Sequence, residues 1–300
     1  MHSKNDKMYF FLVLTAVLWG GNPVAVKSVL GEITPIMTVL FRYIGISAIL
    51  LSIMFIKEGR HALPPKHQIL PLILMGITGI VLNNGLQFIG LQYSTVVNCS
   101  LVAATTPAIT AILAVLFLKE TMNKKQWLGI FISLLGVVYL VAHGSMEIIK
   151  NLSFNKGDLL FLVSQASWAV YTLLGRRVME DVSPMGVTAW AGFSGAIFMG
   201  IAALYEGVAA PSRLSYDTLL SLSYMIIGSG ILAMNWWNTG VRVVGANRAA
   251  IFTNIIPLAA MALSVVLLHE HVGWHEIAGG IWIIFGVYLT TKKTRAVRTA

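Results

Sequence analysis

The side chains of this chain that could do chemistry lie inside long apolar stretches. Trp19 and Trp168 stand near the middle of two such stretches, whereas tryptophan in a membrane protein usually lies at headgroup level. Each indole N–H therefore needs a buried partner. The two rings either pack between helices or form two walls of a cavity for a small molecule, with Tyr171 close to Trp168 as a further wall.

Amide side chains occur at similar depth in two other stretches. Asn83 and Gln87 are four residues apart, which puts them on one face of an α-helix, and Asn235 and Asn238 share one side of a later stretch. A neutral amide both donates and accepts hydrogen bonds, which suits zwitterionic or hydroxylated solutes. Hydrogen bonding between helices without any ligand is the alternative.

Prolines interrupt three of the apolar stretches. Asn22 and Pro23 break the first, because proline lacks an N–H and crowds the carbonyl four residues back. The break leaves a carbonyl free to bind a solute beside the Asn22 side chain. Pro107 and Pro257 could free a carbonyl in the same way, but kinks that only shape packing are the preferred interpretation.

Arg42 is a cation inside the second apolar stretch. A central arginine costs about 2.5 to 3.5 kcal/mol on insertion scales, which the many apolar residues of this stretch offset. One interpretation is that Arg42 extends toward the outer surface, with Glu32 as its counter-ion. The other is that Arg42, together with Lys27, attracts a carboxylate or another anion.

Enzymatic and metal chemistry find little support. The polar candidates at mid-depth are neutral amides, serines and threonines, which do not make a nucleophile and base or a cofactor site, so no enzyme and no cofactor is expected. The run from His269 to Glu276 is not a His-Glu-x-x-His motif, because residue 273 is glycine. The acidic residues fall in tails, loops or stretch ends, so a uniporter, or coupling through a weaker site, is preferred over a proton relay.

Residues near the ends of the stretches are expected to have structural roles. Glu120 and Glu270 are predicted to cap the helices that follow them, the fifth and the tenth. Four further tryptophans are assigned to the headgroup region: Trp127, Trp236, Trp237 and Trp274.

The stretches that carry these residues define the fold class. The chain of 300 residues is 57% hydrophobic and 11% charged, with a mean hydropathy of +0.78. A helix needs about 20 apolar residues to cross a bilayer. We predict an all-α integral membrane protein with ten transmembrane helices, at 8–28, 35–56, 69–92, 96–118, 126–143, 158–175, 184–205, 218–241, 249–268 and 275–291.

The net charge of +9 is an orientation signal. With both termini in the cytoplasm, the outer loops hold only Lys150, Lys156 and Arg213, as the positive-inside rule requires. No basic stripe with interleaved aromatic residues exists, so nucleic acid is excluded as a partner. The cytoplasmic basic residues are Lys4, Lys7, Lys57, Arg60, Lys66, Lys119, Lys124, Lys125, Arg176, Arg177, Arg242, Arg248, Lys292, Lys293, Arg295 and Arg298.

The two halves of the chain match each other at an offset of 149 or 150 residues. Trp19 matches Trp168 and Pro35 matches Pro184; further matched pairs are Pro107 with Pro257, Glu120 with Glu270, Gly129 with Gly279, and Gly136 with Gly286. Two five-helix copies are therefore predicted, at residues 8–143 and 158–291. An odd number of spans inverts the second copy, which is the architecture of alternating access.

Several of these motifs together resemble a known family. They are Trp-Gly-x-Asn at 19–22 with Lys27, Trp-Ala-x-Tyr at 168–171, and the runs from proline to Leu-x-Glu at 107–120 and 257–270. Over residues 8–291 the chain resembles the EamA-type permeases of the drug/metabolite transporter superfamily. The resemblance implies a ten-helix secondary transporter of a bacterial inner membrane, usually an exporter of small metabolites such as amino acids.

The leading hypothesis is thus a carrier of small amphipathic solutes that works by alternating access within a lipid bilayer. A flippase for lipid-linked substrates, a channel and, less favoured, a membrane enzyme are the alternatives. The small residues Gly192, Ala196 and Gly200 recur every four positions and predict a close packing or sliding surface. A homodimer is possible through such a surface but has no other support.

Overall fold

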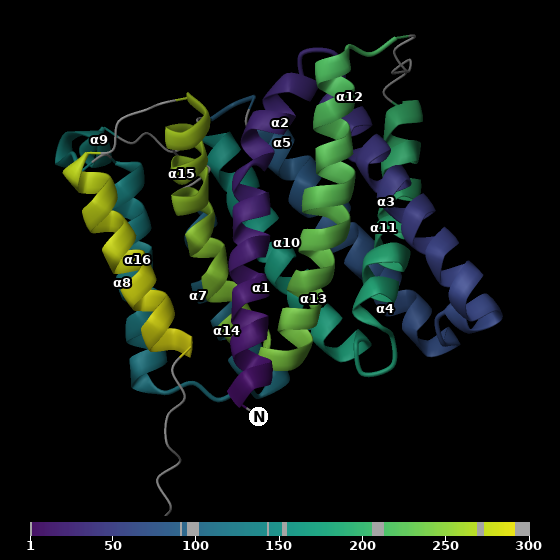
Figure 1. Ribbon diagram of the computed structural model, residues 1–300, viewed down its shortest axis with the longest axis horizontal. Coiled ribbons are helices and arrows are strands. Elements are labelled where there is room, and N and C mark those ends of the chain that lie inside the picture. The colour runs from purple at the N-terminus through teal and green to yellow at the C-terminus, as the bar shows by residue number, and fades with distance from the viewer. Residues whose placement is uncertain are drawn as a thin grey trace, which may run out of the picture.

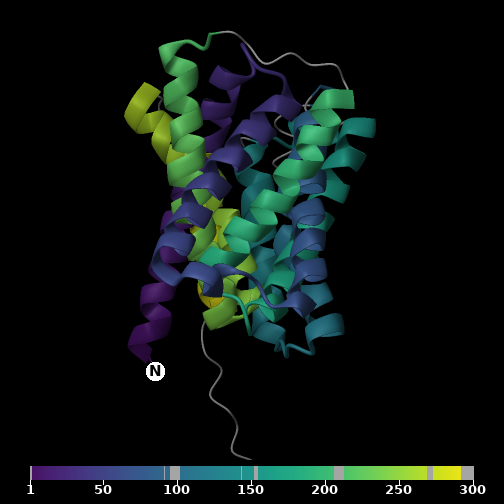
Figure 2. The same ribbon diagram turned by 90° about the vertical axis from the view of Figure 1, so that its right-hand side faces the viewer.

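The computed structural model describes residues 2–90, 92–94, 102–142, 144–151, 155–205, 213–268 and 273–291, and every regular element in these ranges is a helix (Figures 1 and 2). The first half contains α1 (His2–Gly20), α2 (Asn22–Val29), α3 (Pro35–Glu58), η1 (Gly59–Ala62), α4 (Lys66–Gly76), η2 (Ile77–Gly85), α5 (Leu86–Gly90), α7 (Thr106–Leu118) and α8 (Lys124–Val141). After α9 (Met146–Lys150) come α10 (Lys156–Val178), α11 (Pro184–Tyr205), α12 (Tyr216–Ser223), η3 (Tyr224–Leu232), α13 (Ala233–Val244), α14 (Ala246–Ala250), η4 (Ile251–Ile255), α15 (Ile256–Leu268) and α16 (Trp274–Thr291).

The all-helical class is confirmed, and the helices stand side by side in one bundle (Figure 1). Six of the described helical segments are long and apolar enough to cross a membrane, and two shorter apolar helices accompany them. Large apolar side chains cover the outside, for example Ile56 and Leu204, as expected for a surface that faces hydrocarbon. The start of α1 and the end of α16 lie at the same end of the bundle (Figure 1).

The break at Asn22 and Pro23 is present, because α1 ends at Gly20 and α2 begins at Asn22. The carbonyl of Leu18, just before the break, accepts a hydrogen bond from the Tyr224 hydroxyl of η3. Pro107 lies in the first turn of α7, and Pro257 follows the junction where the 3-10 helix η4 passes into α15. The kinks at these two prolines stay a prediction.

Two π-helices occur at corresponding places, which the sequence did not predict. η2 and η3 are each nine residues long and begin 147 residues apart, at Ile77 and Tyr224. A π-helix bonds each N–H to the carbonyl five residues back, which is rare and often marks a functional site. Each one lies in the middle of a long helical segment that α-helices complete on both sides.

Contacts between the halves come in reciprocal pairs. A Cβ added at Gly230 of η3 would meet Ile46 of α3, and one at Gly195 of α11 would meet Ile80 of η2. Ile46 and Gly195 are 149 residues apart, and Ile80 and Gly230 are 150 residues apart, so each contact is the repeat equivalent of the other.

The crossing of α8 with α16 has the same reciprocity. A Cβ at Gly129 would meet the Gly286 carbonyl, and a Cβ at Gly286 would meet the Gly129 carbonyl. Gly136 and Gly279 face each other in the same way. Such close backbone contact is what small residues allow between membrane helices.

Candidate functional site

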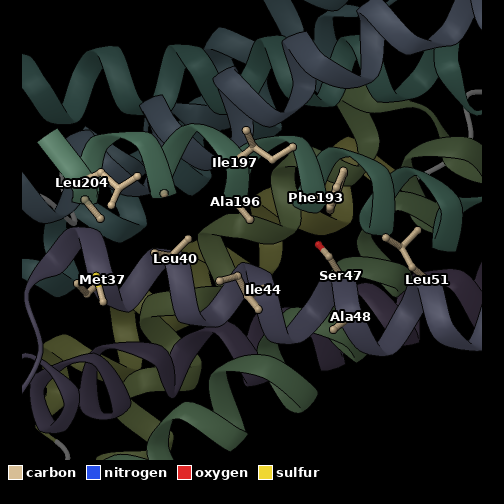
Figure 3. Close-up of a pocket in the computed structure, with 12 residues that line it drawn as sticks. Met37, Leu40, Ile44, Ser47, Ala48, Leu51, Phe193, Ala196, Ile197 and Leu204 are labelled. Carbon is tan, nitrogen blue, oxygen red and sulfur yellow. The ribbon is translucent and has the colours of Figure 1, made fainter. Parts of the chain in front are cut away.

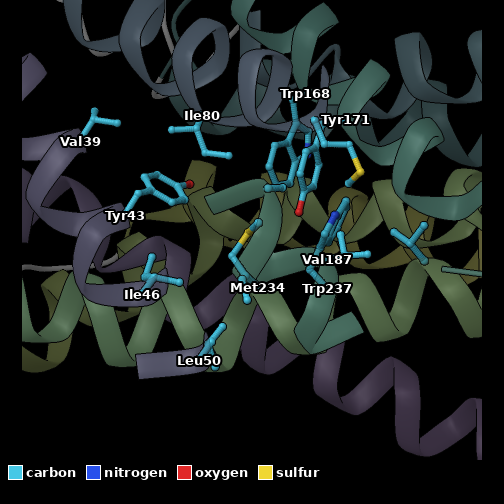
Figure 4. Close-up of a cluster of buried hydrophobic side chains, with 14 of the residues drawn as sticks. Val39, Tyr43, Ile46, Leu50, Ile80, Trp168, Tyr171, Val187, Met234 and Trp237 are labelled. Atoms are coloured by element: carbon cyan, nitrogen blue, oxygen red, sulfur yellow. The ribbon is translucent and has the colours of Figure 1, made fainter. Parts of the chain in front are cut away.

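Aromatic side chains from both halves meet in the interior of the bundle. The Trp19 ring of α1 lies 5.5 Å from the Trp168 ring of α10 and 5.3 Å from the Trp237 ring of α13, measured between centroids. Trp168 stacks on Tyr171 at 4.9 Å. Figure 4 shows Trp168, Tyr171 and Trp237 pointing toward one another from α10 and α13. We call these four residues the aromatic cluster.

The two matched tryptophans find different surroundings. The Trp19 indole donates to the Ser229 carbonyl of η3 at 3.1 Å, so its N–H has the buried partner that the sequence required. Trp168 is buried by its aromatic neighbours. The structure therefore brings three predicted residues together: Trp19, Trp168 and Tyr171.

Trp237 corrects the sequence prediction. We assigned it to the headgroup region, but it is only 1% exposed and completes the aromatic cluster, with a buried indole N–H that has no hydrogen-bond partner. The segment that carries Trp237 runs on as far as Val244, so this tryptophan lies deeper than a span ending at 241 implies. Trp127 and Trp274, at the first turns of α8 and α16, are exposed as expected of interface residues.

An amide and two hydroxyls connect the cluster to α11. Asn238 of α13 donates to the Tyr171 hydroxyl at 3.1 Å and to the Thr188 hydroxyl at 3.0 Å. All three side chains are buried. Asn238 therefore fixes the orientation of Tyr171, and its role in this structure is interhelical hydrogen bonding. Asn235, on the same helix, is half-buried.

Arg42 does not extend to the surface, which corrects one of its two interpretations. It is 6% exposed, and its Nη2 donates to the Ser229 hydroxyl at 3.3 Å. Glu32, the proposed counter-ion, instead accepts the backbone N–H of Ser215. Hydrogen bonding to the Ser215 side chain, and then to its backbone, lowers the pKa of the Glu32 carboxyl. Ser229 thus binds Arg42 through its hydroxyl and Trp19 through its carbonyl. The Lys27 side chain lies outside the part that is described.

The shared face of Asn83 and Gln87 stays a prediction. Asn83 belongs to the π-helix η2, and Gln87 lies in α5 and is half-buried. The Asn83 amide donates to the carbonyl and hydroxyl of Ser164 on α10, at 3.0 and 3.1 Å. Asn22, at the helix break, has a buried side-chain oxygen without a hydrogen-bond partner.

The prediction that Glu120 caps the fifth helix is wrong. Asn123 caps α8, in a reciprocal capping box with Gln126. Glu120 follows α7 and accepts the backbone N–H groups of Ala246 at 3.0 Å and Asn247 at 3.4 Å, so it caps α14 in the other half of the chain. Its repeat partner Glu270 lies outside the described residues.

Near the N-terminal end of the bundle, the two halves also meet in an exposed ion pair. His67 and Gln68 at the start of α4 contact the Asp181 carboxylate at 2.9 and 2.6 Å. These hydrogen bonds, first from His67 and then from Gln68, lower the pKa of Asp181. In the described ranges no three potential metal ligands cluster together; of the run 269–276, residues 269–272 lie outside those ranges.

An apolar groove lies away from the aromatic cluster, between α3 and α11 (Figure 3). It encloses 570 Å³, and Ser47 is the polar residue of its lining. Gly192 packs closely against Ser47, as the small-residue stripe predicted, but Ala196 and Gly200 line the groove instead. None of the predicted binding residues lines it.

Three residues of the interior were missed by the sequence: Trp237, Ser229 and Thr188. Ser229 and Thr188 have no distinctive sequence signal, because serine and threonine are common in membrane helices. Trp237 could have been found by helical periodicity, because it shares a face of α13 with Val241 and Val244 at i+4 and i+7. Together the fold and this interior define a helical membrane protein with a buried aromatic, amide and guanidinium centre.

Comparison with known proteins gives the family. The EamA-like transporter family matches residues 6–142 and again residues 155–292. The chain belongs to the EamA-like transporter family.

Relatives from distant organisms cover nearly the whole chain. The uncharacterized transporter YyaM of Bacillus subtilis is 30% identical over 95% of this chain and 93% of its own length. An uncharacterized transporter of Archaeoglobus fulgidus is also 30% identical, over 96% and 99%. The uncharacterized inner membrane transporter YedA of Escherichia coli is 27% identical over 92% and 87%. These names support a transporter role.

One solved structure shares the fold. A chain titled "Crystal structure of protein" superposes with a TM-score of 0.79, covering 95% of this chain and 96% of its own, at 18% identity. At that identity the match shows the fold alone.

Proposed function

We propose that this protein is a secondary transporter that exports small amphipathic metabolites, such as amino acids, by alternating access. Its two units would be the inverted five-helix halves 8–143 and 158–291, with both termini in the cytoplasm of a bacterium and the ten spans in its inner membrane. The solute would bind near the bilayer midplane, between the halves, where inverted repeats hold their substrates.

The observation that carries the mechanism is the reciprocity of the contacts. Ile46 with Gly230 and Gly195 with Ile80 are equivalent contacts in which the halves exchange roles. A pseudo-two-fold axis that relates two inverted halves gives such pairs, and it allows two conformations in which the halves exchange roles. The matching positions of η2 and η3 support the same relation.

The aromatic cluster supports the location of the solute site. It draws Trp19 from the first half and Trp168, Tyr171 and Trp237 from the second, so a solute held there would contact both halves. Aromatic faces accommodate apolar bodies, and the amides and Arg42 nearby supply polar partners.

Flux measured in proteoliposomes tests the proposal. Vesicles containing the purified protein are loaded with a mixture of isotope-labelled amino acids and related metabolites, and the solutes that leave are identified by mass spectrometry. A carrier gives saturable efflux of a subset, accelerated by the same unlabelled solute outside. Efflux that rises linearly with concentration would indicate a channel, and movement of lipid-linked substrates alone would indicate a flippase.

A matched pair of variants ties the flux to the site. Trp168→Leu alters the buried aromatic cluster and should reduce efflux at least tenfold, whereas Trp274→Leu changes a ring that is 85% exposed and should leave it unchanged. Equal efflux from both variants would contradict the proposed site.

A further inference from the structure

Arg42 is a buried cation that the protein itself leaves partly unpaired. Its Nη2 contacts the Ser229 hydroxyl, and its guanidinium carbon lies 5.6 Å from the Tyr43 ring centre. Its Nε is buried and has no hydrogen-bond partner. We infer that Arg42 binds the carboxylate of the transported solute, an inference that rests on the proposed transport function and names the class of its substrate.

Charge balance is the first argument. Among the residues that the structure describes, the ion pair that forms is that of His67 with Asp181, and no carboxylate pairs with Arg42. Arginine does not deprotonate in proteins, so this site keeps its positive charge. Removing such a charge from water without a partner is costly, and an anion bound beside it offsets that cost.

The donor geometry favours a carboxylate. Nε and a terminal nitrogen of a guanidinium form a planar fork that binds the two oxygens of one carboxylate. A single guanidinium balances one negative charge, whereas a phosphate dianion brings two. Ser229 joins Arg42 to the aromatic cluster through Trp19, at 3.1 Å. A carboxylate on Arg42 therefore leaves the rest of the solute close to aromatic faces, near the unpartnered Trp237 N–H.

The internal repeat supplies an independent argument. The offset of 149 residues that relates Pro35 to Pro184, the first residues of α3 and α11, makes Ala191 the counterpart of Arg42, and Ala191 is buried. The second half thus builds the same helix pairing with an alanine at this position. Helix packing therefore does not require an arginine at this position. The Arg42 guanidinium, present in one half alone, is available to bind the solute carboxylate.

Binding of a matched pair of probes tests the inference on the purified protein, without transport. Phenylacetate and phenylacetamide have the same apolar body and differ in charge. By titration calorimetry we expect the wild type to bind phenylacetate at least tenfold more tightly than phenylacetamide. In Arg42→Gln the preference should fall to less than twofold, while Arg213→Gln, an exposed position, should keep it.

Arg42→Lys is the control for the case that Arg42→Gln does not fold. Lysine keeps the charge but not the planar fork, so phenylacetate should bind it more weakly than the wild type and still better than phenylacetamide binds it. Wild-type protein that binds both probes equally, or neither, overturns the inference, as does a preference that survives in Arg42→Gln. A carboxylate that binds at Arg42 but is not carried in the flux assay would instead overturn the transport proposal.

Discussion

Asn238 is the side chain on which the interior of the site depends most. It is 1% exposed and donates to two hydroxyls, those of Tyr171 and Thr188. Asn238→Ala leaves both hydroxyls buried without this partner, and each such loss costs about 1 to 3 kcal/mol. We expect the free energy of unfolding to fall by about 2 to 4 kcal/mol, measured by circular dichroism during denaturant titration in micelles.

Two further variants separate the hydrogen bonds from the general effect of truncation. Asn235→Ala, at a half-buried position of the same helix, should cost less than Asn238→Ala. Tyr171→Phe should cost about 1 kcal/mol, and combined with Asn238→Ala it should cost less than the sum of the two, because both remove the same bond. Strict additivity would show that the Tyr171 and Asn238 side chains are not coupled.

Among the elements, α11 contains two glycines that predict opposite effects of one added methyl group. A Cβ at Gly195 would lie 2.6 Å from the Ile80 Cβ, so Gly195→Ala overpacks the contact with η2 and should cost about 1 to 3 kcal/mol. At Gly200 the nearest atom is the Leu40 Cδ1 at 3.8 Å, so Gly200→Ala should stabilise α11 by up to about 1 kcal/mol. Thermal unfolding in detergent compares the two.

The contact of Gly45 on α3 with Ile226 of η3 refines this prediction. A Cβ at Gly45 would also lie 2.6 Å from its neighbour, but that neighbour is the Cδ1 at the flexible end of Ile226. Gly45→Ala should therefore cost less than Gly195→Ala. A Gly195→Ala variant as stable as Gly200→Ala would show that η2 moves away from α11 at little cost.

The turn after α7 carries a contact that links the halves. Glu120→Ala uncaps α14, whereas Asn123→Ala uncaps α8 within one half, and each should cost about 1 kcal/mol. Only the Glu120 variant releases the start of α14 from α7. The measurement uses the double variant Cys99→Ser, Asn247→Cys, labelled by a membrane-impermeant maleimide added on the cytoplasmic side. Adding Glu120→Ala should raise the labelling rate of residue 247 at least fivefold. Adding Asn123→Ala instead should leave that rate unchanged.

For the whole molecule, the sequence predicted what depends on composition and repetition. Helix starts at Pro35 and Pro184, the break before Pro23 and the meeting of Trp19 with Trp168 all follow from local chemistry or from the offset between halves. The partner of Glu120 lies more than a hundred residues away on another helix, so no local rule identifies it.

The π-helices were not predicted for a related reason. The segment η2 makes contacts with other helices, such as Ile80 against Gly195 and Asn83 against Ser164, and these contacts exist only after the helices assemble. The predicted position of Trp237 was wrong because the predicted span ended at residue 241, whereas the helix that carries Trp237 continues to Val244.

Reciprocity also predicts which contacts persist during transport. In the second conformation, each residue would take the place of its repeat equivalent in the other half. A contact whose repeat-equivalent contact is also present in this structure can therefore remain in both conformations. Gly129 with Gly286 maps onto Gly279 with Gly136, and both pairs are present. The contact of Glu120 with α14 maps onto Glu270 and residues near 96, which lie outside the described ranges.

Cross-linking distinguishes the two kinds of contact. On α8 and α16 the Tyr139 and Trp282 rings lie 5.4 Å apart, and a short bis-maleimide across Tyr139→Cys and Trp282→Cys should leave efflux within about twofold of the uncross-linked variant, since this crossing is retained. The same reagent across Glu120→Cys and Asn247→Cys should stop efflux if, as the proposed alternating access implies, this contact between the halves opens during transport. Efflux that survives the second cross-link would show that Glu120 belongs to a fixed part of the bundle, and efflux lost with the first would place movement at the α8 and α16 crossing.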